Sequence, residues 1–214
     1  ILGNTKENPA VGCVIVKNDS IISAGHTGIN GRPHAEQNAI LYSKSNIKNS
    51  DLYVTLEPCS HYGKTVPCVK TIIRNKIKRV FFSIKDPDPR SYNKSTKQFK
   101  KNKIRVQNGI LGSDIKNFYK SYFKYKENIL PFVTGKIATS KDNFIYLKQK
   151  KKITNNHCDN VSHLLRYKND SILVTGKTVN IDNPKLDCRI KGLSNYSPIR
   201  IILDRSLSIN NNSC

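Results

Sequence analysis

The 214-residue sequence contains no methionine, no tryptophan, few acidic residues and no long apolar run. Because it lacks Met, it does not begin at an initiator residue, and we expect a fragment or a processed chain. A membrane-spanning helix needs about 20 consecutive apolar residues, and no segment approaches that length. The opening ILGNTKENP also lacks the charged and apolar regions of a signal peptide. These absences predict a cytoplasmic protein with no membrane span.

Acidic residues number 15 against 37 Lys and Arg, which gives a net charge of +22. Clustered cations are typical of nucleic-acid-binding surfaces. Here the lysines are spread along the whole chain among abundant Asn and Ile, a bias that genome composition also produces. The basic runs at 97–105 and 148–152 indicate solvated faces. We therefore do not expect nucleic acid to be the biological partner.

Two of the six cysteines occur in a pattern with one His and one Glu. His34 and Glu36 are followed about 25 residues later by Cys59, and then by Cys68. One imidazole and two thiolates can hold zinc and leave its fourth position to water, whose pKa falls to about 7. In zinc-dependent base deaminases, a Glu that is not a ligand carries the protons. The pattern predicts His34, Cys59 and Cys68 as zinc ligands, Glu36 as the catalytic residue, and reduced thiols.

Prolines precede both parts of this pattern. Residues two apart point to different sides of a regular helix, so His34 and Glu36 can face one ion only at a helix N-terminus. Pro33 predicts that a helix begins there, because proline is favourable at the first helical position. Pro67 indicates the same before Cys68, and we expect the exposed amides to lower the pKa of this thiol.

Strand and helix patterns alternate, which predicts an α/β chain with a junction near residue 130. The paired Asp-Pro dipeptides at 86–89 mark a turn. Strands are predicted at 10–16, 21–24, 52–56, 80–84 and 104–106, and in the second half at 132–138, 171–175 and 199–203. Helices are predicted to begin at Pro33 and at Pro67. A third helix is predicted to begin near Ser113 or Asp114, with apolar residues on one face as far as 123, and a fourth is predicted to contain Val161, Leu164 and Leu165.

The two cysteines are separated by eight residues, whereas many zinc deaminases separate them by two. The segment TLEPCSHYGKTVPC at 55–68 resembles the zinc segment of the pyrimidine deaminase of riboflavin biosynthesis. NPAVGCVIV at 8–16, GRPHAEQNAI at 31–40 and IKRVFFSIKDPDP at 77–89 are similar to the same family, in the same order. In the second half, FVTGKIATS, SILVTGKTVNIDNPKLDCR and SPIRIILD resemble the reductase domain of that family.

The resemblance implies a bifunctional deaminase/reductase. A cytidine-deaminase-like three-layer domain, with a mixed sheet and helices on both faces, would occupy residues 1–129 without its N-terminal helix. A truncated dihydrofolate-reductase-like α/β domain would occupy 130–214. The first would convert 2,5-diamino-6-(5-phosphoribosylamino)pyrimidin-4(3H)-one to 5-amino-6-(5-phosphoribosylamino)uracil, and the second would reduce the ribose chain. Zinc, NADPH and a phosphoribosylated pyrimidine are the implied partners, and the family's tendency to associate leaves a homo-oligomer open.

The resemblance also implies residue roles, position by position. For the deaminase, substrate contacts would come from Asn8, His26, His61 and Lys64. For the reductase, cofactor contacts would come from Lys136, Thr139, Thr154, Thr178 and Asp182, and substrate contacts from Arg166, Leu186 and Arg189.

The sequence departs from the family at several places. The glycine-containing loop usual after Pro89 is replaced by Arg-Ser-Tyr-Asn-Lys at 90–94. The usual Ser-Leu-Asp-Gly becomes Ser-Lys-Asp-Asn at 140–143, and the usual Trp-Ile-Thr becomes Lys-Ile-Thr at 152–154. A Gly-rich cofactor segment expected later does not occur in the sequence. We therefore expect the reductase half to be incomplete.

Two other functions remain open at this point. An RNA-editing deaminase would share the zinc pattern and suit the positive charge. A non-enzymatic, zinc-stabilised binding module would also use His and Cys, because structural zinc sites are built from the same residues.

Overall fold

The computed structural model describes residues 1–128, 130–145, 152–210 and 213. The chain divides into two compact units, which we consider separately: unit 1 comprises Ile1 and Thr5–Val133, and unit 2 comprises Leu2–Asn4 and Thr134–Cys214. Most of the basic run predicted at 148–152 lies outside the described residues. Among the helices of the described residues, none is long and apolar enough to cross a membrane.

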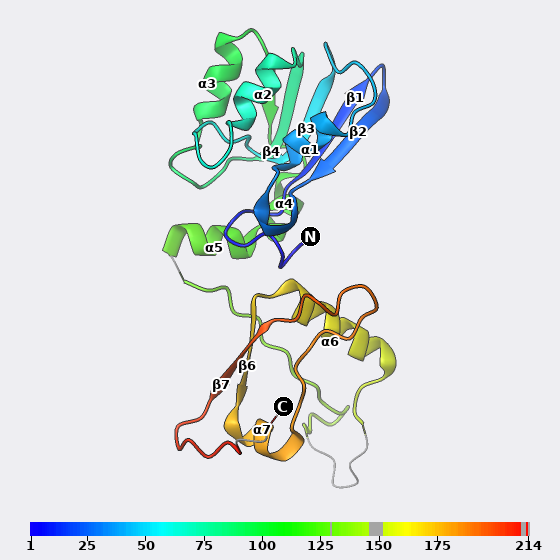
Figure 1. The fold of residues 1–214 in the computed structure, drawn as a ribbon, viewed down its shortest axis with the longest axis vertical. Coiled ribbons are helices and arrows are strands. Elements are labelled where there is room, and N and C mark those ends of the chain that lie inside the picture. Colours follow the sequence, from blue (N-terminus) through cyan, green and yellow to red (C-terminus); the bar gives the residue numbers. More distant parts are fainter. Residues whose placement is uncertain (129, 146–151, 211–212, 214) are drawn as a thin grey trace. The chain divides into compact units, whose positions relative to one another are not determined.

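Unit 1 is built on a five-stranded mixed sheet with the strand order β2-β1-β3-β4-β5 (Figure 1). Strand β1 pairs antiparallel with β2 and β3, whereas β3, β4 and β5 run parallel. Alternate residues of β1, Cys13 and Ile15, are buried, as the alternating pattern of a strand requires. The strands are β1 Gly12–Lys17, β2 Ser20–His26, β3 Asp51–Leu56, β4 Arg79–Ile84 and β5 Arg105–Asn108, which confirms the strands predicted here.

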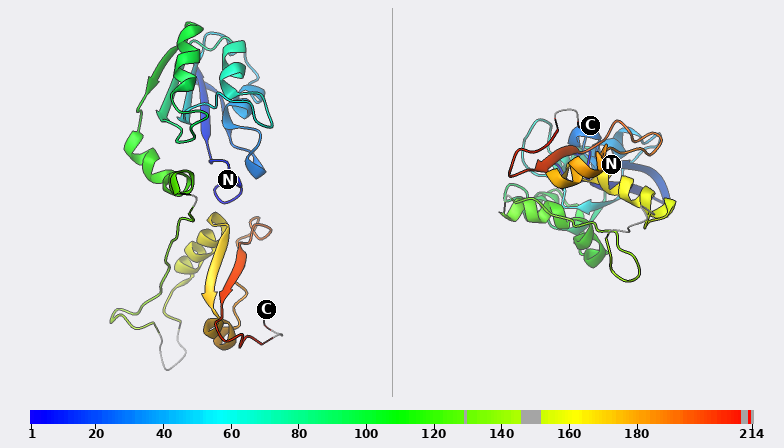
Figure 2. Two further views of the ribbon diagram at one scale, coloured as in Figure 1. Left: turned by 90° about the vertical axis from the view of Figure 1, so that its left-hand side faces the viewer. Right: turned by 90° about the horizontal axis from the view of Figure 1, so that it is seen from below.

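Helices cover both faces of this sheet (Figure 2). The buried face of β3, with Leu52 and Val54, packs in one core with Ala35, Val69 and Phe99 from three helices. On the other face, the hydroxyl of Tyr119 lies 2.7 Å from Thr55 Oγ1. The predicted three-layer arrangement is confirmed. The helices are α1 Ala35–Leu41, α2 Cys68–Arg74, α3 Lys94–Lys101, α4 Gly112–Phe118 and α5 Lys120–Asn128.

Two local predictions need correction. Pro33 does not occupy the first helical position, because His34 is the N-cap of α1, with an extended backbone that turns its ring toward the site. The single helix expected from Ser113 onward is two helices, which separate at the buried Tyr119. The basic run 97–105 presents its lysines to solvent as predicted, and part of it is helix α3, anchored by the fully buried Phe99. The sequence did not predict this helix, because one apolar residue among many lysines shows no helical periodicity.

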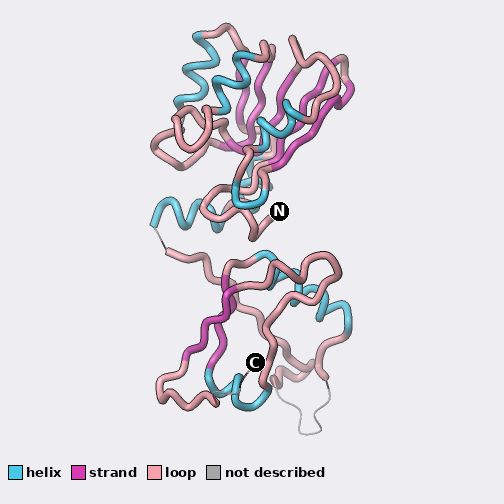
Figure 3. The backbone as a smooth tube through the Cα atoms, in the orientation of Figure 1, coloured by secondary structure: helices cyan, strands magenta, loops and turns pink. Residues whose placement is uncertain are grey.

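Unit 2 contains a parallel strand pair joined through a helix (Figure 3). The side chain of Asn155 caps its first helix by accepting from the backbone N–H of Cys158. The strand predicted at 132–138 is wrong: this segment is an extended loop, and no strand among the described residues pairs with it. Its elements are α6 Asn156–Lys168, β6 Ser171–Thr175, α7 Gly176–Asp182 and β7 Ile199–Leu203.

Candidate metal centre and active site

Two helix N-termini of unit 1 bring the predicted metal ligands together. His34 caps α1, and Cys68 is the first residue of α2. The Nδ1 atom of His34 lies 3.5 Å from Cys59 Sγ and 3.3 Å from Cys68 Sγ. Tetrahedral zinc, with its usual bond lengths to nitrogen and sulfur, separates two such ligand atoms by roughly 3.6 Å. These three residues therefore fit a zinc ion, and their ligand atoms all lie within 4.8 Å of one another.

The two thiols differ in their affinity for protons. The Cys68 thiol and backbone N–H both donate toward Cys59, which lowers the pKa of Cys59 to about 4. The same hydrogen bond, together with burial, raises the pKa of Cys68 well above its ordinary value. The prediction that the helix N-terminus would acidify Cys68 is therefore wrong, because Cys68 is the donor of the pair. A coordinated metal would deprotonate either thiol.

Glu36 belongs to the first turn of α1 and is only 4% exposed. Burial and the nearby Cys59 thiolate raise the pKa of Glu36 to about 7. A carboxyl group with such a pKa can both take up and release a proton near neutral pH. Its position beside the three ligands and this pKa suit the proton carrier that the sequence predicts.

A cavity of about 130 Å³ opens at this centre. Its wall includes His34, Glu36 and Cys59, so that a molecule inside it can reach the metal position.

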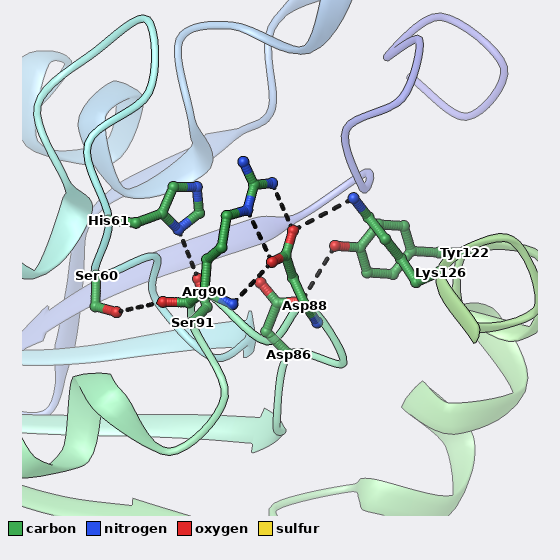
Figure 4. Close-up of polar contacts among 8 residues, drawn as sticks. All are labelled: Ser60, His61, Asp86, Asp88, Arg90, Ser91, Tyr122 and Lys126. Carbon is green, nitrogen blue, oxygen red and sulfur yellow. Dashed lines mark hydrogen bonds and ion pairs between the residues drawn. The ribbon is translucent and has the colours of Figure 1, made fainter. Parts of the chain in front are cut away.

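One side of the cavity is formed by the loop after β4 and by helix α5 (Figure 4). Asp88 accepts two hydrogen bonds from the Arg90 guanidinium, at 2.9 and 2.6 Å, and forms an ion pair with Lys126 at 3.4 Å. Asp86 accepts from Tyr122 OH at 3.1 Å. Arg90 holds the pKa of Asp88 well below its ordinary range, whereas burial raises the pKa of Asp86 to about 6.

The predicted substrate residues of the deaminase separate into two groups. Asn8 and His61 line the cavity, and His61 Nδ1 lies 3.1 Å from Ser91 Oγ. His26 and Lys64 are exposed and do not belong to the cavity wall. The roles of all four residues stay predictions.

The predicted reductase residues lie in unit 2, where the Arg166 side chain and the Arg189 backbone both contact His163. Arg166 Nη1 lies 3.1 Å from His163 Nδ1, and the backbone N–H of Arg189 lies 3.2 Å from the same atom. Leu186 is buried two residues before Cys188. The residues predicted to contact cofactor are exposed or half-buried and are spread over the unit: Lys136, Thr139, Thr154, Thr178 and Asp182.

Sequence reasoning missed the charged residues of the cavity wall, above all Arg32, Arg90 and Lys126. The paired Asp-Pro dipeptides were interpreted only as a turn. Their position directly after a strand of the parallel part of the sheet was the available signal, because ligands bind at the carboxyl ends of such strands. Nothing in the sequence indicated that Lys126, nearly 40 residues later, would reach the same loop.

Two family models match the chain. The model for the cytidine and deoxycytidylate deaminase zinc-binding region matches residues 2–84. The model for the RibD C-terminal domain matches residues 131–213. The first match contains the three candidate ligands and Glu36.

Curated relatives match along almost the whole chain. The riboflavin biosynthesis protein RibD of Bacillus amyloliquefaciens is 38% identical over 209 residues, which cover 97% of this chain and 56% of that protein. RibD of Escherichia coli is 32% identical over 213 residues, 94% of this chain and 58% of that protein. The chain thus spans little more than half the length of these relatives.

Solved structures agree with this likeness. A diaminohydroxyphosphoribosylaminopyrimidine deaminase/5-amino-6-(5-phosphoribosylamino)uracil reductase from Thermotoga maritima superimposes with a TM-score of 0.89 at 38% identity. The match covers 96% of this chain and 59% of that one. RibD of Acinetobacter baumannii superimposes with a TM-score of 0.87 at 30% identity, covering 99% of this chain and 61% of that one.

Proposed function

We propose that this chain is a member of the RibD family of riboflavin biosynthesis proteins and that unit 1 is a zinc-dependent pyrimidine deaminase. The proposed reaction removes the ring amino group of 2,5-diamino-6-(5-phosphoribosylamino)pyrimidin-4(3H)-one as ammonia. One observation carries the proposal. His34, Cys59 and Cys68 leave a zinc ion one position short of four ligands, and Glu36 lies beside that position in the wall of the cavity.

The residues of the site would have different roles in the reaction. His34, Cys59 and Cys68 would hold zinc, which when bound supplies Lewis-acid activation of water. Glu36 would carry two protons in turn, one from water to the ring nitrogen and one from the new ring hydroxyl to the departing ammonia, because its pKa of about 7 allows both uptake and release. Asn8 and His61, which line the cavity, would orient the pyrimidine.

For unit 2 we propose a part in NADPH-dependent reduction of the ribose chain. The match to the RibD C-terminal domain supports this role. We place the domain boundary near residue 130 and the protein in the cytoplasm, where the five described cysteines, all free, would stay reduced. Self-association is a further proposal, which the solution mass will test.

The decisive experiment measures ammonia release by the zinc-loaded full chain. We expect turnover of the phosphoribosylated diaminopyrimidine, loss of turnover when a chelator removes zinc, and recovery when zinc is added back. The same assay with RNA oligonucleotides is the matched comparison.

Ammonia released only from RNA would replace the proposal with an RNA-editing deaminase. No release from either substrate, with X-ray absorption showing four protein ligands around zinc, would favour a zinc-stabilised binding module.

A further inference from the structure

We propose that Arg90 and Lys126 form the subsite that binds the phosphate monoester of the deaminase substrate, with Asp88 as the residue that positions both cations. The inference rests on the proposed function and deepens it. It assigns a role to the segment in which this chain departs from the glycine-containing loop of its family.

Asp88 holds the guanidinium of Arg90 in place along one edge and leaves the other edge available to a ligand. Its Nε and Nη2 atoms donate to the two carboxylate oxygens of Asp88 at 2.9 and 2.6 Å. The Asp88 side chain is 8% exposed, whereas that of Arg90 is 62% exposed. Within the part of the chain that the structure describes, Nη1 has no acceptor, and Figure 4 shows one guanidinium nitrogen pointing away from Asp88. A planar guanidinium anchored along one edge presents its remaining N–H groups in a set direction.

Lys126 brings a second cation to the same carboxylate from helix α5. Its Nζ lies 3.4 Å from Asp88 Oδ2, and its side chain is 23% exposed. Two cations thus share one carboxylate, and neither forms an ion pair with another acidic residue among those described. A phosphate monoester carries close to two negative charges near neutral pH, so it can pair with both cations, and a side chain held by Asp88 loses less entropy when it binds.

The other buried carboxylates of the cavity do not compete for these cations. Glu57 accepts from Ser95 Oγ at 2.6 Å and from the backbone N–H of Asn93 at 3.2 Å. Asp86 accepts from Tyr122 OH and from the backbone N–H of Asp88. Each of these carboxylates has its own donors, which leaves Asp88 as the partner of Arg90 and Lys126.

The cavity connects this subsite with the metal centre. Its wall includes Arg90 and Lys126 together with His34, Cys59 and Glu36. A molecule whose ring is at the metal can therefore extend its phosphoribosyl group toward the two cations. Lys64, the cation that the family resemblance suggests, is exposed and does not belong to this wall.

The test compares the substrate with its dephosphorylated riboside in zinc-loaded wild type, Arg90→Ala, Arg90→Lys and Lys126→Ala. For Arg90→Ala we expect KM for the phosphorylated substrate to rise by about tenfold or more, with kcat nearly unchanged and no change for the riboside. Lys126→Ala should show a smaller rise of the same kind. Arg90→Lys should restore only part of the affinity, because lysine keeps the charge without the two-pronged contact to Asp88.

Two comparison variants separate local from general effects. Lys101→Ala removes an exposed charge of α3 outside the cavity and should leave both substrates unaffected. Lys64→Ala tests the competing position for the phosphate. A rise in KM that follows Lys64→Ala and not Arg90→Ala would overturn the inference.

A binding measurement keeps the inference separate from the deaminase proposal. Calorimetry with ribose 5-phosphate and with inorganic phosphate on the zinc-loaded full chain needs no turnover. Ribose 5-phosphate that binds wild type at least about tenfold more tightly than Arg90→Ala supports the subsite, even if no pyrimidine is deaminated. Equal binding to both proteins would refute it, even if deamination is confirmed.

Discussion

The backbone N–H of Cys68 points at Cys59 Sγ over 3.3 Å, although eight residues separate the two cysteines in the sequence. The intervening residues form a loop, and two of them, His61 and Gly63, line the cavity. A two-residue spacing would close the metal centre as well but would leave no chain to form this wall. The long spacing therefore links metal binding to the shape of the substrate site.

Cys59→Ser should abolish stoichiometric zinc binding. We expect zinc affinity to fall by at least about 100-fold, because serine is a poor ligand for zinc in place of a thiolate. That factor is the upper end of the cost of losing a hydrogen-bond partner of a metal ligand, and the loss of a ligand itself should cost at least as much. Metal analysis of the folded protein measures this. Cys13→Ser is the matched control, since Cys13 is a buried cysteine of β1 that is not part of the ligand cluster. Retained zinc in Cys59→Ser would contradict the assignment.

Gly25→Ala should strongly destabilise unit 1. A Cβ at Gly25 of β2 would clash with the backbone of Ala39 and lie 2.6 Å from the carbonyl oxygen of Ala35, so that α1 could not pack closely on the sheet. We expect a loss of about 3 kcal/mol in the free energy of unfolding, the upper end of the range typical of an overpacked core, because the Cβ meets backbone atoms.

Gly12→Ala provides the comparison for Gly25→Ala. A Cβ there meets only Thr55 Cγ2, at an ordinary 3.8 Å, so denaturant unfolding should reveal a change within about 0.5 kcal/mol. Similar stabilities for the two variants would show that the close approach of α1 to β2 does not limit stability.

Sequence patterns predicted those strands and helix starts that depend on residues close together in the chain. Alternation predicted strands such as Leu52 to Leu56, and two Pro-preceded segments predicted the helix starts that hold His34 and Cys68. Periodicity could not reveal that Tyr119 leaves its helix to reach Thr55, because that contact joins residues 64 apart. For the same reason, the ligand cluster was predictable, whereas the meeting of Asp88 with Lys126 needed the three-dimensional structure.

Glu36→Gln should separate zinc binding from catalysis. Glutamine keeps the size of the side chain but cannot carry a proton, so we expect full zinc content and a fall in kcat of about 10²- to 10⁴-fold. Glu7→Gln is the control, because Glu7 is an exposed carboxylate in the wall of the same cavity. Its kcat should stay within about twofold of wild type, since it has no part in proton transfer. An active Glu36→Gln enzyme would remove Glu36 from the mechanism.

Asp86 should make the stability of unit 1 fall as the pH rises. Burial raises its pKa to about 6, against about 3.9 for an unfolded Asp. The folded state therefore binds this proton more tightly than the unfolded state. The resulting stabilisation is complete below about pH 4 and is lost as the pH rises through about 6, a difference of roughly 3 kcal/mol.

Asp86→Asn isolates this contribution because asparagine is neutral throughout and its oxygen can still accept from Tyr122 OH and from the backbone N–H of Asp88. Urea unfolding at pH 4, 6 and 8 should show wild type losing stability relative to Asp86→Asn, with most of the change between pH 4 and 7. Taking the difference at each pH cancels the other titrating groups, which the two proteins share. Asp114→Asn, at an exposed position of α4, should follow wild type at every pH. Parallel pH profiles for wild type and Asp86→Asn would mean that Asp86 stays ionised in the folded protein, with its donors outweighing its burial.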